Sequence, residues 1–175
     1  VRMHSVNQRD FAAAEIEDHG VLVVHTVGTQ HANRALVESE SLAIEHDPRL
    51  LNLLLIDFKG GSTFRGFRDL PHTVGMVTNL DGTLVRRALE ALKAETEYRQ
   101  QFLKEKNMRD ITQYHQFYSR NFHRNKKYIP LPHLIIIVDE FAQLAREMPD
   151  FMKELVRTVQ VGRSLGLHLI LGTQS

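Results

Sequence analysis

An uninterrupted apolar segment, Leu134 to Val138, is the strongest constraint that this sequence places on its fold. Pro130 and Pro132 precede it, and proline interrupts regular structure because it fixes φ and lacks an N–H donor. A short apolar run bounded in this way is typical of a strand buried on both faces, at the centre of a parallel sheet. Two carboxylates, Asp139 and Glu140, follow it directly. We therefore expect an α/β sheet with two acids at the carboxyl end of its central strand.

The position of these acids suggests a chemistry, because open α/β sheets bind ligands at the carboxyl ends of their strands. Asp139 can hold a hydrated Mg²⁺, since this ion prefers oxygen ligands and keeps several waters. Glu140 can then orient or deprotonate an attacking water. This arrangement is the Walker B motif of P-loop NTPases. A buried strand that happens to end in two solvated acids has the same sequence, so both interpretations stay open at this point.

Further apolar runs alternate with segments of helical periodicity, and this alternation predicts a mainly parallel sheet flanked by helices. Polar side chains follow the strands, among them Asp57 and Gln174. Since parallel strands end on one side of a sheet, we expect Asp57, Asp139, Glu140 and Gln174 along one edge. Gln174 is placed to sense a γ-phosphate or position water. The expected strands are 21–24, 51–56, 74–77, 134–138 and 167–171, and the expected helices are 82–106, 110–122, 141–147 and 150–164.

The loop after the first expected strand departs from a phosphate-binding loop. Such a loop has the pattern G-x-x-x-x-G-K-S/T, with glycines that let N–H groups point inward, a lysine for the phosphates and a hydroxyl for Mg²⁺. Here Gly28 is the one glycine, and Thr29 or Gln30 takes the lysine position, depending on the register. The helix start after Gly28, Thr29, Gln30 and His31 still offers N–H groups to an anion. A plain strand–helix turn fits these residues better than a tight phosphate site.

Composition narrows the classes of function. The chain has 175 residues, enough for a single domain with a core, and its net charge of +1 creates no general attraction to nucleic acid or acidic membranes. It has no cysteine, which excludes disulfides and thiolate metal sites. No apolar run approaches the ~20 residues of a membrane span. The chain stops at Ser175 just after a strand-like run, so we expect one module, 1–175, of a longer multi-module chain.

Five separated motifs occur in an order that resembles the FtsK/SpoIIIE ATPases, and more closely one ATPase module of the EccC/EssC motor proteins of type VII secretion. The resemblance covers about residues 50–175 and is specific, because the motifs lie far apart. They are DFKGG (57–61), LPHTVGMVTNL (70–80), EYRQQFL (97–103), PHLIIIVDEFAQL (132–144) and PDFMKELVRTVQVGRSLGLHLILGTQ (149–174).

The resemblance implies a RecA-like P-loop NTPase core that uses ATP and Mg²⁺. It assigns Asp139 to Mg²⁺, Glu140 to the attacking water and Gln174 to a sensor position. It also implies neighbouring modules in a ring-forming oligomer, a secreted protein or its signal sequence as partner, and a place on the cytoplasmic side of the cell membrane within a membrane-anchored motor. The family loop is close to GTTGSGKSE, whereas VHTVGTQHA (24–32) lacks the lysine and the serine. We therefore expect weak ATP binding and slow or absent hydrolysis.

Three functions follow from these observations. The first is an ATPase-fold module of a secretion motor with reduced or absent hydrolysis. The second is a non-catalytic module of such a motor, which binds a signal sequence or a neighbouring module. The third is a DNA-translocating ATPase module, which ranks last because the chain is nearly neutral and ends before a DNA-reading domain.

Overall fold

The structure is a computed structural model that describes residues 16–17, 21–25, 43–57, 63–78, 82–122 and 127–173. Within these residues, six strands form one sheet in the order β1-β2-β6-β5-β3-β4. Neighbouring strands are parallel except for the β1–β2 pair. This confirms the expected parallel sheet. The strands are β1 (Ile16–Glu17), β2 (Val21–His25), β3 (Leu51–Asp57), β4 (Thr73–Val77), β5 (His133–Asp139) and β6 (Leu167–Thr173).

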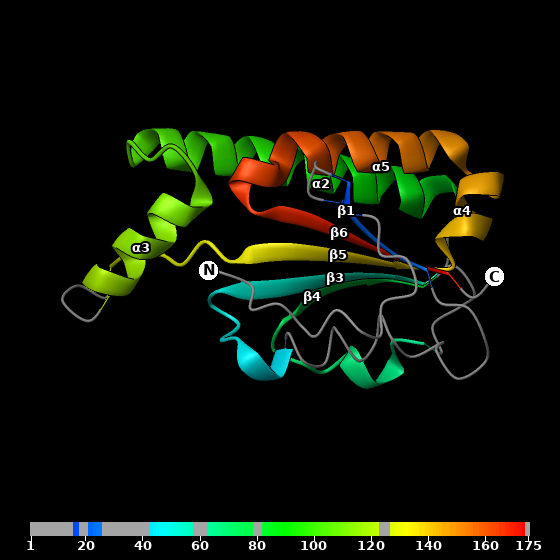
Figure 1. The fold of residues 1–175 in the computed structure, drawn as a ribbon, viewed down its shortest axis with the longest axis horizontal. Helices are drawn as coiled ribbons and strands as arrows, with labels where there is room; N and C mark the ends of the chain where they lie inside the picture. Colours follow the sequence, from blue (N-terminus) through cyan, green and yellow to red (C-terminus); the bar gives the residue numbers. More distant parts are fainter. Residues whose placement is uncertain are drawn as a thin grey trace.

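The helices also follow the predicted pattern. Figure 1 shows α2 and α5 over one face of the sheet and α4 beside the carboxyl ends of the strands. The short helix η1 lies on the other face, and α3 lies near the amino end of β5. The helices are η1 (Arg65–Phe67), α2 (Gly82–Glu105), α3 (Ile111–Asn121), α4 (Phe141–Glu147), α5 (Pro149–Gly162) and η2 (Arg163–Leu165).

Both faces of β5 are buried, as its unbroken apolar run predicts. Ile136 belongs to the core that packs under α2 and α5, whereas its neighbour Ile137 belongs to a second core on the opposite face. This alternation follows from the two-residue period of a strand. Phe64, just before η1, and Phe67, the last residue of η1, belong to the second core. The carboxyl edge of the sheet is thereby held rigidly by packing on both sides.

Local signals account for the ends of several helices. Asp110 precedes α3, and its Oδ1 accepts a hydrogen bond from the Gln113 amide at 2.8 Å, which satisfies one free N–H of the first turn. Pro149 stands in the first turn of α5. Gly166 follows η2 with φ of 88°, and a side chain there would clash with Ile111, so glycine is required.

One basic residue of α2 is buried. An amphipathic surface helix usually exposes its charged residues, but the side chain of Arg99 is only 2% exposed. Its Nη1 donates to the Leu165 carbonyl at 2.9 Å, and its Nε donates to Glu95 Oε1 at 2.7 Å. These bonds compensate the burial of the charge and attach α2 to the turn before β6.

Parts of the sequence analysis lie outside the described residues. They include most of the helix expected after the first strand, of which Ala43–Glu45 are described as helical. Asp81, a residue type that favours the N-cap and directly precedes α2, also lies outside.

Candidate functional site

The carboxyl ends of β3 and β5 bring two acids together. Asp57 and Asp139 are direct partners across these parallel strands. Both are buried, with exposed fractions of 0% and 6%. Figure 1 shows this edge of the sheet next to α4. The strand ends therefore carry a pair of adjacent, buried carboxylates, Asp57 and Asp139.

Glu140 forms the turn between β5 and α4. Its backbone is left-handed, with φ of 57° and ψ of 41°, and its side chain is 7% exposed. Its N–H donates to Asp139 Oδ1 at 3.0 Å, and its carbonyl accepts from the amides of Gln143 and Leu144. A left-handed conformation costs a residue other than glycine ~1–2 kcal/mol. Such strain is concentrated at functional sites, where the surrounding structure enforces it.

Burial and charge act together on Asp139. Burial raises the pKa of its carboxyl above the usual value, and the negative charges of Glu140 and Asp57 raise it further. Hydrogen bonds from the Thr63 side chain and the Glu140 amide act in the opposite direction and lower this pKa. The net shift is upward, so the ionised form is destabilised in the absence of a positive charge. A cation at this edge would relieve that repulsion.

The donor set fits Mg²⁺. Carboxylate and hydroxyl oxygens are the ligands this ion prefers, and it usually retains several waters. Within the described part of the chain, no three histidine, cysteine, aspartate or glutamate side chains are arranged to hold a metal ion. The residues therefore fit an ion held by one or two carboxylates and completed by water and phosphate, and not a site made by protein ligands alone.

The other predicted site residues are not described. Gly28, Thr29, Gln30 and His31 lie outside the described residues, and so does Gln174. The strands that lead to them are described, and His25 at the end of β2 pairs with Thr173 at the end of β6. The chain thus leaves β2 and β6 at the same edge of the sheet that carries Asp139.

The sequence analysis did not single out Thr63, which contacts both acids. Its N–H donates to Asp57 Oδ2 at 3.3 Å, and its side chain hydrogen-bonds the Asp139 carboxylate. A threonine in a turn has no motif of its own. The one available signal is its position shortly after the strand that ends in Asp57.

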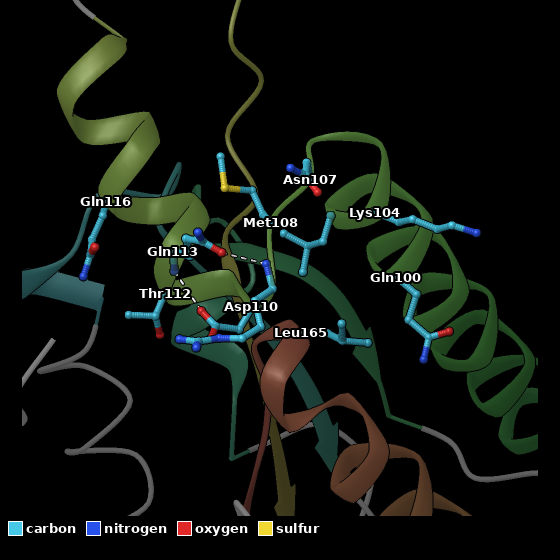
Figure 2. Close-up of a pocket in the computed structure, with 11 residues that line it drawn as sticks. Gln100, Lys104, Asn107, Met108, Asp110, Thr112, Gln113, Gln116 and Leu165 are labelled. Carbon is cyan, nitrogen blue, oxygen red and sulfur yellow. Dashed lines mark hydrogen bonds and ion pairs between the residues drawn. The ribbon is translucent and has the colours of Figure 1, made fainter.

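A separate pocket of about 1020 Å³ lies where α2 meets α3 (Figure 2). Leu165 contributes to its wall, and this residue precedes the amino end of β6, so the pocket is at the opposite end of the strands from Asp139. Four of its eleven lining residues carry uncharged amides, and three are charged: Lys104, Arg109 and Asp110. No helix of the described residues combines the length and apolar character needed to span a membrane.

Comparison with known proteins gives a consistent assignment. The FtsK/SpoIIIE family model matches residues 32–175. The type VII secretion system protein EssC of Staphylococcus aureus is 47% identical over 156 residues, which are 89% of this chain and 10% of EssC. The chain thus spans about a tenth of the length of that relative.

Two solved structures share the fold. The cytoplasmic domain of the Thermomonospora curvata type VII secretion ATPase EccC matches with a TM-score of 0.71 and 33% identity, covering 87% of this chain and 18% of that one. ATPases 2 and 3 of the same EccC, in complex with a signal sequence peptide, match with a TM-score of 0.70 and 22% identity, covering 87% and 27%. The RecA-like P-loop ATPase core expected from the motifs is confirmed. Because the family model matches most of its length, the chain belongs to the FtsK/SpoIIIE family.

Proposed function

We propose that this chain is an ATPase-fold module of a type VII secretion motor, which binds ATP and Mg²⁺ weakly and hydrolyses ATP slowly or not at all. Membership of the FtsK/SpoIIIE family implies nucleotide binding in general. The observation that carries the proposal is the buried Asp139–Glu140 pair at the carboxyl edge of the sheet. The similarity to EssC and EccC supports the assignment to a secretion motor on the cytoplasmic side of the membrane, with neighbouring modules as partners.

The residues of the edge have distinct roles in this proposal. Asp139 would hold Mg²⁺, which would supply positive charge to neutralise the phosphates. Glu140 orients the attacking water and accepts its proton. Gln174 is the proposed sensor of the phosphate. The strained Glu140 backbone fixes its carboxylate relative to Asp139, which is the positioning that phosphoryl transfer requires.

The weak affinity follows from residues 24–32. The stretch VHTVGTQHA lacks the lysine that would contact the β/γ-phosphates and the serine or threonine directly after it that would hold Mg²⁺. A hydrogen bond to a charged group contributes ~1.5–3 kcal/mol, and 1.4 kcal/mol corresponds to a tenfold change in affinity. Losing one such contact and one metal ligand therefore weakens ATP binding by roughly two to three orders of magnitude.

Calorimetric titration with ATP and Mg²⁺ tests the proposal. We expect weak binding by the unmodified chain and tighter binding after loop repair with Gln30→Lys and His31→Ser, or one residue later with His31→Lys and Ala32→Ser. Glu147→Gln removes an exposed carboxylate from α4 and should leave affinity unchanged. Micromolar or tighter binding by the unmodified chain, with turnover that Glu140→Gln abolishes, would show that the loop is competent and the proposal wrong.

A second candidate is a non-catalytic module that binds a signal sequence. EccC ATPases 2 and 3 were solved with such a peptide, and the pocket between α2 and α3 offers amide side chains suited to a peptide backbone. Anisotropy of a labelled type VII signal peptide tests it. Gln116→Arg, in the pocket lining, should weaken binding, whereas Gln160→Arg on the exposed surface of α5 adds the same charge and should not. Equal binding by both variants would exclude this pocket.

A further inference from the structure

Thr63 joins the two strands that carry the buried acids. Its backbone N–H donates to Asp57 Oδ2 at 3.3 Å, while its side chain hydrogen-bonds Asp139. Asp57 and Asp139 are direct cross-strand partners, so one residue contacts both members of the pair.

Packing holds Thr63 in this position. The next residue, Phe64, is fully buried in the core on the η1 face of the sheet, and its ring meets Phe67 edge-on with centroids 6.2 Å apart. The Phe64 carbonyl accepts from the Phe67 amide at 3.0 Å. Since the residue after Thr63 is anchored by both contacts, the hydroxyl is presented to Asp139 by a rigid turn.

The hydrogen bonds to Asp139 leave room for a cation. An ionised carboxylate only accepts hydrogen bonds and has about four lone-pair positions. The Glu140 amide uses one at Oδ1, and the Thr63 hydroxyl uses another. Two donors set the orientation of the carboxylate, and no other hydrogen bond from the described residues takes up the lone pairs that a cation or its waters would use.

We propose that Thr63 is a positioning residue for the divalent-cation site, in which its hydroxyl orients Asp139 and its amide holds Asp57 beside it. This inference rests on the proposed function, because it concerns the same edge. In P-loop proteins a Ser or Thr hydroxyl of the phosphate loop meets the metal site together with the Walker B aspartate. Residues 24–32 have no Lys-Ser or Lys-Thr pair to supply that hydroxyl at the family position, whereas Thr63 supplies one beside Asp139 from the turn before η1. Thr63 acts through Asp139 and does not itself react.

Mn²⁺ binding to the nucleotide-free chain, followed by the electron paramagnetic resonance signal of the free ion, tests this role. Thr63→Val removes the hydroxyl at nearly constant shape, and we expect Mn²⁺ affinity to fall about tenfold, the effect of one charge-assisted hydrogen bond. Thr63→Ser keeps the hydroxyl and should remain within about twofold of the unmodified chain. Thr73→Val, which removes a hydroxyl bonded to the Phe67 carbonyl at the far end of β4, should not change affinity.

Several outcomes overturn the inference. They are undiminished Mn²⁺ binding by Thr63→Val, equal losses in Thr63→Val and Thr63→Ser, and Mn²⁺ binding that is absent or insensitive to Asp139→Asn. Equal losses in the two variants would mean that the packing of the threonine side chain, and not its hydroxyl, sets the Mn²⁺ affinity. ATP titration separates this inference from the proposed function: the expected Mn²⁺ results without any ATP binding would keep the role of Thr63 and reject the nucleotide site.

Discussion

Arg99 shows how a single charged residue is used in the interior. A buried guanidinium is costly unless its donors are paired, and Arg99 pairs with the Leu165 carbonyl and with Glu95. Leu165 ends η2, the turn between α5 and β6. Arg99 therefore connects α2 to the turn that precedes the last strand, and its charged side chain contributes to the stability of the fold.

We expect Arg99→Met to destabilise the chain by about 2 kcal/mol, because the Leu165 carbonyl would be left buried without this donor. Lys93→Met is the matched control on the same helix. The Lys93 side chain is 53% exposed and pairs with Glu154 on the surface, so its loss should cost less than about 0.5 kcal/mol. Urea unfolding curves measure both. Equal stability of the two variants would mean that the Arg99 bonds contribute little.

At the scale of the element, the turn from β5 to α4 combines strain with chemistry. Glu140 adopts a left-handed backbone that glycine would adopt without cost. Glu140 alone joins the end of β5 at Asp139 to the start of α4 at Phe141, and it does so in this left-handed conformation. A glutamate thus occupies a position whose backbone conformation favours glycine. Strain of this kind is concentrated at functional sites, which is consistent with a functional role for this carboxylate.

We expect Glu140→Gly to be more stable than Glu140→Ala by about 1 kcal/mol, since both lose the carboxylate but only glycine relieves the positive φ. Gln143, in the regular part of α4, should show the opposite order, with alanine more stable than glycine by about 1 kcal/mol. Thermal unfolding of the four variants tests this. Alanine as the better residue at both positions would contradict the left-handed turn.

At the scale of the whole molecule, the two ends of the strands carry different titratable groups. Acids gather at the carboxyl ends, and histidines from three elements gather near the amino ends of β5 and β6. His133 Nδ1 lies 3.0 Å from His168 Nε2, and the rings of His115 and His133 meet edge-on. Burial lowers the pKa of His133 to about 3, with the nearby His168, His115 and Arg99 adding to the shift. The pKa values of His115 and His168 are also lowered, chiefly by burial.

This cluster makes folding stability depend on pH. The unfolded chain takes up protons at these histidines near the ordinary pKa of about 6.5, whereas folded His133 resists protonation down to about 3. Its contribution to stability is therefore complete above pH 6.5 and is lost as pH falls towards 3. His133 contributes a slope of up to about 1.4 kcal/mol per pH unit within this window, and His115 and His168 act in the same direction.

Urea unfolding between pH 7 and pH 5 should show this slope, and His133→Gln should reduce it. Asp47→Asn is the control: Arg49 holds the Asp47 pKa at about 2 by hydrogen bonding, so its stabilising contribution is lost only as pH falls below the ordinary value of 3.8. The Asp47 variant should keep the slope between pH 7 and pH 5. A slope unchanged by His133→Gln would assign the pH dependence to other groups.

The sequence by itself determined the strands, most helices and the edge at which Asp57 and Asp139 meet. These features follow from local rules. An unbroken apolar run such as Leu134 to Val138 must be buried on both faces, and parallel strands must end on one side. Asp110 and Gly166 set their turns through their own backbone and side-chain preferences.

Only the tertiary structure decided which distant side chains meet. Thr63 reaches Asp139, Arg99 reaches Leu165, and His133 reaches His168, although the members of each pair are far apart in the chain. Helical periodicity assigns Arg99 to one face of α2, but it does not predict that the Leu165 carbonyl lies against that face. A single threonine such as Thr63 carries no periodic signal at all. Local propensity depends on a few neighbouring residues, whereas burial and pairing depend on how whole elements pack, and packing therefore decided these contacts.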